Sequence, residues 1–104
     1  MRLGRDPFRD VIARQLDLFV EDEADLLEEC REKSRDYERA DREDREEAYG
    51  DWVDAVEAAT EALADMRDRF ARTLDEDAAG TYEDSFNRAV RKRWSELGLE
   101  IEHR

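Results

Sequence analysis

The sequence predicts an all-α fold, in which a long antiparallel helical hairpin and a shorter C-terminal helix form a three-helix bundle. The strongest observation is a seven-residue repeat of apolar positions at Tyr49, Val56, Leu63 and Phe70, which is typical of an amphipathic helix that buries one face. Similar stripes lie before and after this repeat. Since they are separated by a charged stretch and by a short run containing glycine, we expect three helices.

Composition indicates a thin hydrophobic core. The chain has 104 residues, which is the size of a single domain (1–104). Its apolar fraction is 39%, below the usual range of roughly 45–50%, and its charged fraction of 47% far exceeds the typical value of about 25%. Regular apolar spacing nevertheless indicates order. Because a small helical domain of this kind is marginally stable alone, we expect it to complete its core by dimerisation.

The net charge of −13 restricts the partners of this chain. It argues against nucleic acid, whose phosphates require Lys and Arg, and against an anionic membrane surface. It permits a basic protein partner or simply high solubility. The bases are sixteen Arg and two Lys. An acid-rich, Lys-poor chain fits halophilic adaptation to a salt-rich cytoplasm, and it equally fits a GC-rich genome.

A single cysteine, Cys30, rules out an intrachain disulfide. It falls on an apolar stripe, so we expect a buried small side chain rather than a nucleophile. No apolar run approaches the ~18 residues of a membrane span, and the N-terminus shows no apolar leader segment. These features predict a soluble, cytoplasmic protein.

The first helix is predicted over about residues 6–38. Asp6 followed by Pro7 is typical of a helix start, with the Asp as N-cap and the Pro in the first turn. Glu23 falls where the stripe calls for an apolar residue. It is either an edge position whose carboxylate reaches water or an inward-facing acid with a function.

The hairpin tip is predicted over about residues 38–48. From Glu38 to Glu47 the chain contains no apolar residue except Ala40, and its opposite charges fall four residues apart, which supports a solvated helix or turn. The bend itself is expected within residues 36–51. The second helix then runs over about residues 45–77.

The third helix is predicted over about residues 81–97. Thr81 is the expected N-cap, and Gly98 is the expected stop.

The two long stripes are nearly symmetric about Glu43, which predicts the hairpin register. Reflection through this residue pairs Tyr37 with Tyr49, Cys30 with Val56, and Leu16 with Phe70. About sixteen helical residues span only about 24 Å, so the third helix cannot cover the half of the hairpin nearer its tip. An uncovered apolar patch with aromatic residues marks an interface. The predicted interface residues are Tyr37, Tyr49, Trp52, Val53 and Val56.

Two segments are acidic without an interleaved base. Residues 17–29 hold seven acids, and residues 51–65 hold five. In a hairpin these segments lie side by side and form an acidic belt, which is either simply solvated, a docking face for a basic partner, or a cation site. Repulsion within the belt should raise the pKa values of its carboxylates.

One pattern resembles a known family. The segment Leu27-Glu28-Glu29-Cys30-Arg31-Glu32 resembles the EExxE helix of MazG-like all-α nucleoside triphosphate pyrophosphohydrolases, and Glu46 to Asp51 is similar to that family's EExxD helix. Here Glu47 and Asp51 are four residues apart, one more than the family pattern. The resemblance implies a Mg²⁺ site, and oxygen ligands suit that ion. Its ligands would be Glu28, Glu29, Glu32, Glu47 and Asp51.

The sequence therefore predicts a non-catalytic, acidic helical interaction or assembly protein that associates with itself and requires no cofactor. A MazG-like, Mg²⁺-dependent hydrolase is the alternative. A third hypothesis is an antitoxin-like or nucleic-acid-mimicking acid that binds a basic protein. With one cysteine and one histidine, the chain offers neither the Cys/His spacing of a zinc site nor a Ser-His-Asp arrangement.

Overall fold

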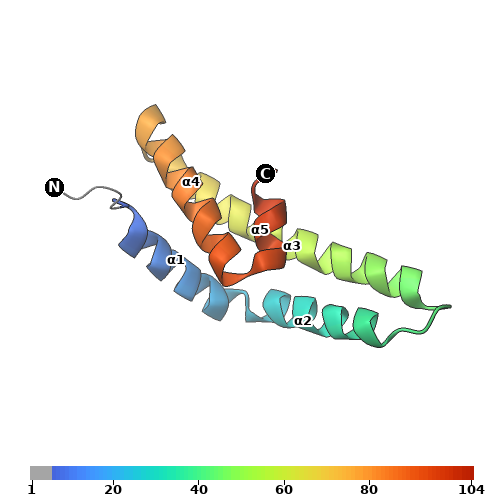
Figure 1. The fold of residues 1–104 in the computed structure, drawn as a ribbon. Coiled ribbons are helices and arrows are strands. Elements are labelled where there is room, and N and C mark those ends of the chain that lie inside the picture. The colour runs from blue at the N-terminus through green and yellow to red at the C-terminus, as the bar shows by residue number, and fades with distance from the viewer. Residues whose placement is uncertain (1–5) are drawn as a thin grey trace.

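The computed structural model describes residues 6–104 apart from the side chain of Leu99, and within this range the chain is all-α. The prediction of fold class is confirmed, but the described residues form five helices instead of three (Figure 1). Their bounds are α1 Arg9–Asp22, α2 Ala24–Arg39, α3 Arg45–Ala71, α4 Glu76–Arg93 and α5 Ser95–Ile101. No helix in the described part has both the length and the apolar character needed to cross a membrane.

The predicted first helix is broken at Glu23. This residue is the C-cap of α1 and the N-cap of α2, with φ −116° and ψ 34°, while its N–H still donates to the carbonyl of Phe19. The break redirects the chain, so that α1 packs on α4 and α2 packs on α3. Glu23 is half-buried at the bend. The charged residue in the apolar stripe thus marks the point where the stripe changes partners.

Helix α1 begins at Arg9 with Phe8 as its N-cap, so Asp6 is not the N-cap that the sequence predicts, although it lies in the turn that leads into the helix. The Asp6 carboxylate accepts a hydrogen bond from the Phe8 N–H at 2.8 Å, and the Asp6 carbonyl accepts one from Arg9 N–H at 3.3 Å. Asp6 therefore satisfies donors of the first turn that have no partner within the helix.

The hairpin of α2 and α3 has the predicted register. The Tyr37 and Tyr49 rings lie 5.5 Å apart, and the Cys30 thiol donates to the Ala55 carbonyl at 3.3 Å, one residue from the predicted partner Val56. The two helices are joined through residues 40–44, inside the predicted range for the bend. Cys30 is buried, as predicted, and burial raises the pKa of its thiol, with nearby Glu96 and Glu29 adding to the shift.

The boundaries of the C-terminal part differ from the prediction. Helix α4 begins five residues earlier than expected, because the Asp75 carboxylate accepts from the Ala78 N–H at 2.8 Å and caps the helix. Thr81 lies inside α4, where its hydroxyl donates to the Asp77 carbonyl. The predicted N-cap at Thr81 is therefore wrong. Helix α4 starts earlier because Asp75, six residues before Thr81, is itself a good N-cap residue and follows the turn after α3.

The C-terminal stripe turns back on itself at Trp94. This residue leaves helical geometry with φ −140° and ψ 97°, and α5 follows it and packs on both α3 and α4. Gly98 lies within α5 and is not a helix stop. A Cβ at this position would overlap the backbone of Arg91, so glycine is what allows α5 to approach α4.

Helix α4 lies between α1 and α3. Tyr82 is fully buried, and its ring centroid lies 5.4 Å from that of Phe8, the N-cap of α1, and 4.8 Å from that of Phe70 on α3. Helix α1 is not among the helices that pack closely on α3. The sequence predicted that Leu16 pairs with Phe70, but α4 lies between the two helices that carry these residues.

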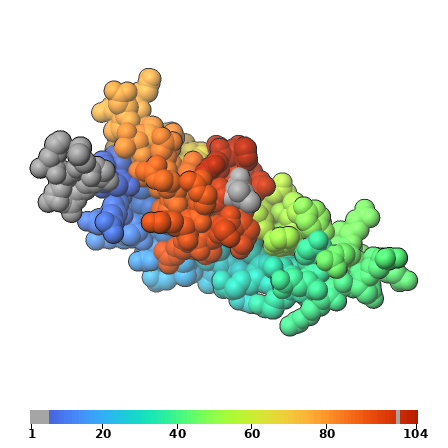
Figure 2. Space-filling model, in the orientation of Figure 1, coloured from blue at the N-terminus to red at the C-terminus, as the bar shows by residue number. Residues whose placement is uncertain are grey.

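The molecule is elongated, with extents of 56 × 24 × 22 Å. We call α2 together with the first half of α3, residues 24–58, the arm, and we call the rest of the described chain the body. Figure 2 shows the body at the left and the arm, in cyan and green, extending to the right. The buried core continues from the body into the near half of the arm, where Leu27, Cys30, Ala55 and Val56 are buried.

Candidate functional site: an aromatic patch on an acidic arm

The outer half of the arm carries three aromatic side chains in mutual contact. Tyr37 stacks on Trp52 with ring centroids 5.5 Å apart and planes inclined by 20°, and Tyr49 meets both rings at 5.5 and 6.1 Å. The Arg45 guanidinium covers the Tyr37 ring at 4.9 Å. We call Tyr37, Tyr49 and Trp52 the aromatic patch. The hairpin register explains it, because α2 and α3 bring residues from both sides of the bend to the same place.

The patch is open to solvent on one side. Tyr49 is 50% exposed, whereas Tyr37 and Trp52 are half-buried against each other. Helices α2 and α3 build this part of the molecule, and α5 reaches it only from the side of the body, where Glu96 and Glu100 lie beside a groove that Tyr49 and Trp52 also line (Figure 1). Large exposed aromatic surface is costly in water, and its contact with another surface is favourable.

One predicted interface residue is not available for contact. Val56 is only 7% exposed, and Val53 is half-buried. The reason is α5, which was not predicted and which reaches α3 after the turn at Trp94. A groove of about 210 Å³ lies between α3 and α5. Its walls combine Tyr49, Trp52, Val53 and Val56 with the carboxylates of Glu57, Glu96 and Glu100.

A signal for α5 is present in the sequence. Trp94, Leu97 and Ile101 are three and four residues apart, the spacing of one helical face, and both Leu97 and Ile101 are buried. The prediction of a helix stop at Gly98 left out this helical segment beyond Trp94. Glu96 and Glu100 therefore escaped notice as neighbours of the aromatic patch.

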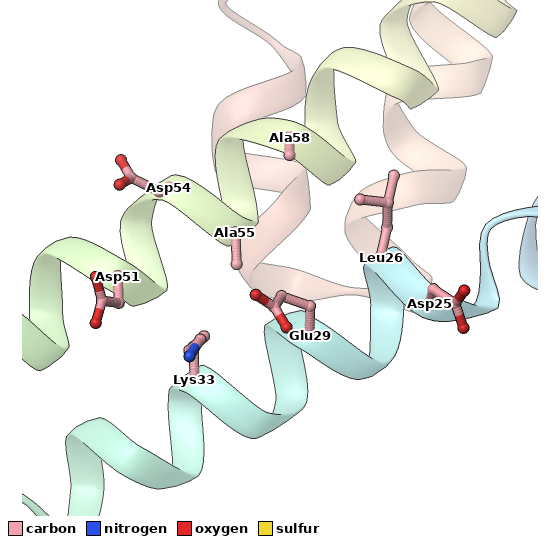
Figure 3. Close-up of a pocket in the computed structure, with 8 residues that line it drawn as sticks. All are labelled: Asp25, Leu26, Glu29, Lys33, Asp51, Asp54, Ala55 and Ala58. Atoms are coloured by element: carbon pink, nitrogen blue, oxygen red, sulfur yellow. The ribbon is translucent and has the colours of Figure 1, made fainter.

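An acidic groove of about 590 Å³ lies between α2 and α3 of the arm (Figure 3). Asp25 and Glu29 line it from α2, and Asp51 and Asp54 line it from α3. Lys33 extends from α2 into the space between the helices. The whole arm contains fourteen acidic and six basic residues, a net charge of −8.

The five acids of the Mg²⁺ hypothesis do not converge. Glu29 and Asp51 share the acidic groove, but Glu28 turns to Arg31 and Arg35, with both carboxylate–guanidinium distances at 3.3 Å. Glu32 and Glu47 are exposed. Within residues 6–104, no three His, Cys, Asp or Glu side chains are grouped so that they could hold a metal ion. The geometry thus gives the hydrolase alternative no support.

The acidic belt is partly neutralised by bases from outside its two segments. The hydrogen bonds from Arg35 and Arg31 hold the pKa of Glu28 below its usual value, which is opposite to the rise expected for the belt. At the other end, the Arg93 guanidinium of α4 lies 3.0 Å from the Asp17 carboxylate. The predicted rise in pKa is therefore wrong at Glu28, because Arg31 and Arg35, one and two turns further along α2, reach back to its carboxylate.

Comparisons of this chain with models of protein families, with curated proteins and with solved structures found no match.

Proposed function

We propose that this chain is a non-catalytic helical interaction protein that associates with itself through the aromatic patch on its arm. The observation that carries the proposal is Tyr49, which is half exposed near the start of α3, at the outer end of the arm. A second copy would supply the missing cover. The core of the body needs no such help, since Tyr82, Phe86 and Leu63 are already fully buried.

The composition of the patch supports this function. Tyr, Trp and Arg are the residue types that dominate binding energy in protein interfaces, and here Tyr37, Tyr49, Trp52 and Arg45 adjoin one another. Their mutual stacking fixes the rings before any partner binds. Little side-chain entropy would then be lost on association.

The experiment is sedimentation of the wild-type chain over a concentration series, compared with Tyr49→Ser. We expect a reversible dimer or larger species at micromolar concentration, and a dissociation constant raised at least tenfold in the variant, which corresponds to about 1.4 kcal/mol. Leu18→Ser is the matched control. Leu18 is 48% exposed but lies on α1, outside the aromatic patch. A monomeric wild-type chain, or equal effects of the two variants, would contradict the proposal.

Docking of a basic protein is the second candidate, and the groove between α3 and α5 favours it. An aliphatic stem could lie against Val53 and Trp52 there, while a guanidinium would meet aromatic faces and the Glu57, Glu96 and Glu100 carboxylates. This function predicts that an Arg-rich peptide changes the fluorescence of Trp52 in a monomeric chain. Glu96→Gln with Glu100→Gln should abolish the change, whereas Glu21→Gln with Glu61→Gln should not.

A further inference from the structure

Helices α1 and α4 form a second groove on the body, about 520 Å³ in volume, with the opposite charge to the arm. The two helices run in the same direction, since Phe8 faces Tyr82 and Phe19 faces Trp94. They adjoin in Figure 2, where α1 is blue and α4 is orange. Ile12, Ala13 and Ala89 give the groove an apolar floor. We call it the basic groove because its rims carry Arg9, Arg88, Arg91 and Lys92.

Three of these four cations have no acidic partner among residues 6–104. Arg91 pairs with Glu102, but no carboxylate of the described chain lies within ion-pair distance of Arg9, Arg88 or Lys92. Asp6 is the one acid that lines the groove. A surface with four bases and one acid is unexpected in a chain with 31 acids and 18 bases.

Helix stability accounts for only part of this charge. Arg91 and Lys92 lie in the last turn of α4, where the helix dipole favours cations. Arg9 is the first residue of α1, where the same effect disfavours a cation. Gathering Arg9 with Arg88 and Lys92 also costs energy through repulsion between like charges. An anionic occupant would offset both costs.

We infer that the basic groove receives the arm of a second copy, so that the chains associate head to tail. This inference rests on the proposed self-association and names the surface on which the arm docks. The charges are complementary, because the arm has a net charge of −8 and extends from the body along the longest axis of a molecule 56 Å in extent. At physiological salt the Debye length is about 8 Å, so the distant arm of the same chain does not neutralise the groove.

The groove also suits the arm in polarity. Its apolar floor can accept the exposed Tyr49 ring, while the bases on its rims can meet the carboxylates of α3 that flank this ring, such as Glu46 and Asp51. A head-to-tail contact uses two different surfaces on each chain. It therefore leaves a free arm and a free groove at the ends of a pair, and it builds a chain or a closed ring instead of a simple dimer.

The test uses two variants that each lose one of the two surfaces. The groove variant carries Arg9→Gln, Arg88→Gln and Lys92→Gln, and the arm variant carries Tyr49→Ser. Sedimentation should find each variant monomeric alone at concentrations where the wild type associates. An equimolar mixture should form a one-to-one dimer and nothing larger, because one intact arm then meets one intact groove. Arg14→Gln with Arg69→Gln and Arg72→Gln is the control with the same charge change at exposed sites, and it should associate like the wild type.

Several results would overturn the inference and leave the proposed function standing. The first is a groove variant that associates like the wild type. The second is an equimolar mixture of the two variants that stays monomeric, although circular dichroism shows that both variants are folded. Salt gives an independent measure. Association between opposite charges should weaken at least tenfold from 0.05 to 0.5 M NaCl, because the Debye length shortens. Stronger association in high salt would indicate contact between two acidic arms instead. A wild-type chain that never associates would overturn the proposed function itself.

Discussion

Arg67 holds the end of α5 in place from inside the body. It is only 4% exposed, and its guanidinium donates to the carbonyls of Ile101 at 3.3 Å and Arg104 at 2.9 Å. It also donates to Asn87 and pairs with Asp68 at 2.9 Å. The Ile101 carbonyl lies in the last turn of α5, where it also accepts from the Arg104 N–H at 3.2 Å, and the helix dipole favours a cation at this end. The apolar pattern of α3 could not identify Arg67, because its partners come from α4 and from the end of the chain.

Replacing Arg67 by Ala should lower the free energy of unfolding by about 2–4 kcal/mol, because buried acceptors lose hydrogen bonds from a charged donor. Urea unfolding measures this loss. Arg69→Ala is the matched control on the same helix, and since Arg69 is exposed its effect should stay within about 0.5 kcal/mol. Equal effects of the two variants would show that the contacts of Arg67 do not stabilise the fold.

Tyr82 makes the fold sensitive to alkaline pH. Its hydroxyl donates to Gln15 at 2.7 Å, and burial raises its pKa from 10.0 to about 12. The unfolded chain thus releases this proton at a lower pH than the folded chain does. The stabilisation is complete below pH 10 and is lost as pH rises to about 12. Unfolding free energies measured across this range should fall less steeply for Tyr82→Phe than for the wild type. Parallel curves would contradict the buried, protonated state.

Breaks within helices are the elements that the sequence did not predict. Glu23 and Trp94 leave helical geometry without proline or glycine at either position. The break at Glu23 lets the chain pass from packing on α4 to packing on α3, and the break at Trp94 turns α5 back so that it packs on both α3 and α4. The bend and register of the hairpin were predictable because they follow from local charge and from the symmetry of two stripes. The start of α4 was missed because the cap signals at Asp75 and Thr81 compete within the same few residues.

Two glycines provide a matched test of the packing of α5. Gly98→Ala should lower the unfolding free energy by about 1–3 kcal/mol, because its methyl group would overlap Arg91 and push α5 from α4. Gly80→Ala should raise it by about 0.5–1 kcal/mol, since Gly80 lies within α4 and its Cβ would meet no atom. Thermal or urea unfolding measures both. A stabilising Gly98→Ala would mean that α5 is not held against α4.

At the scale of the whole molecule, charge and packing divide the chain into a body and an arm. The body buries Tyr82, Phe86 and Leu97 among four helices, whereas the outer end of the arm, built by α2 and α3, exposes Tyr49. The sequence predicted an uncovered patch and most of its residues, because a short third helix cannot span a long hairpin. It could not predict that α4 separates α1 from α3 or that α5 covers Val56, since both depend on long-range packing. The basic groove was hidden for the same reason, because its bases come from opposite ends of the sequence.

The most direct test of the account is to observe what lies against Tyr49 and Trp52 when the chain associates. Isotope-filtered nuclear magnetic resonance, on an equimolar mixture of labelled and unlabelled protein, detects contacts between copies only. The account predicts intermolecular contacts from both aromatic rings, and the basic groove further predicts that they involve Ala13 and Ala89. Associated protein in which neither ring contacts another copy would contradict the assignment of the arm as the interaction surface.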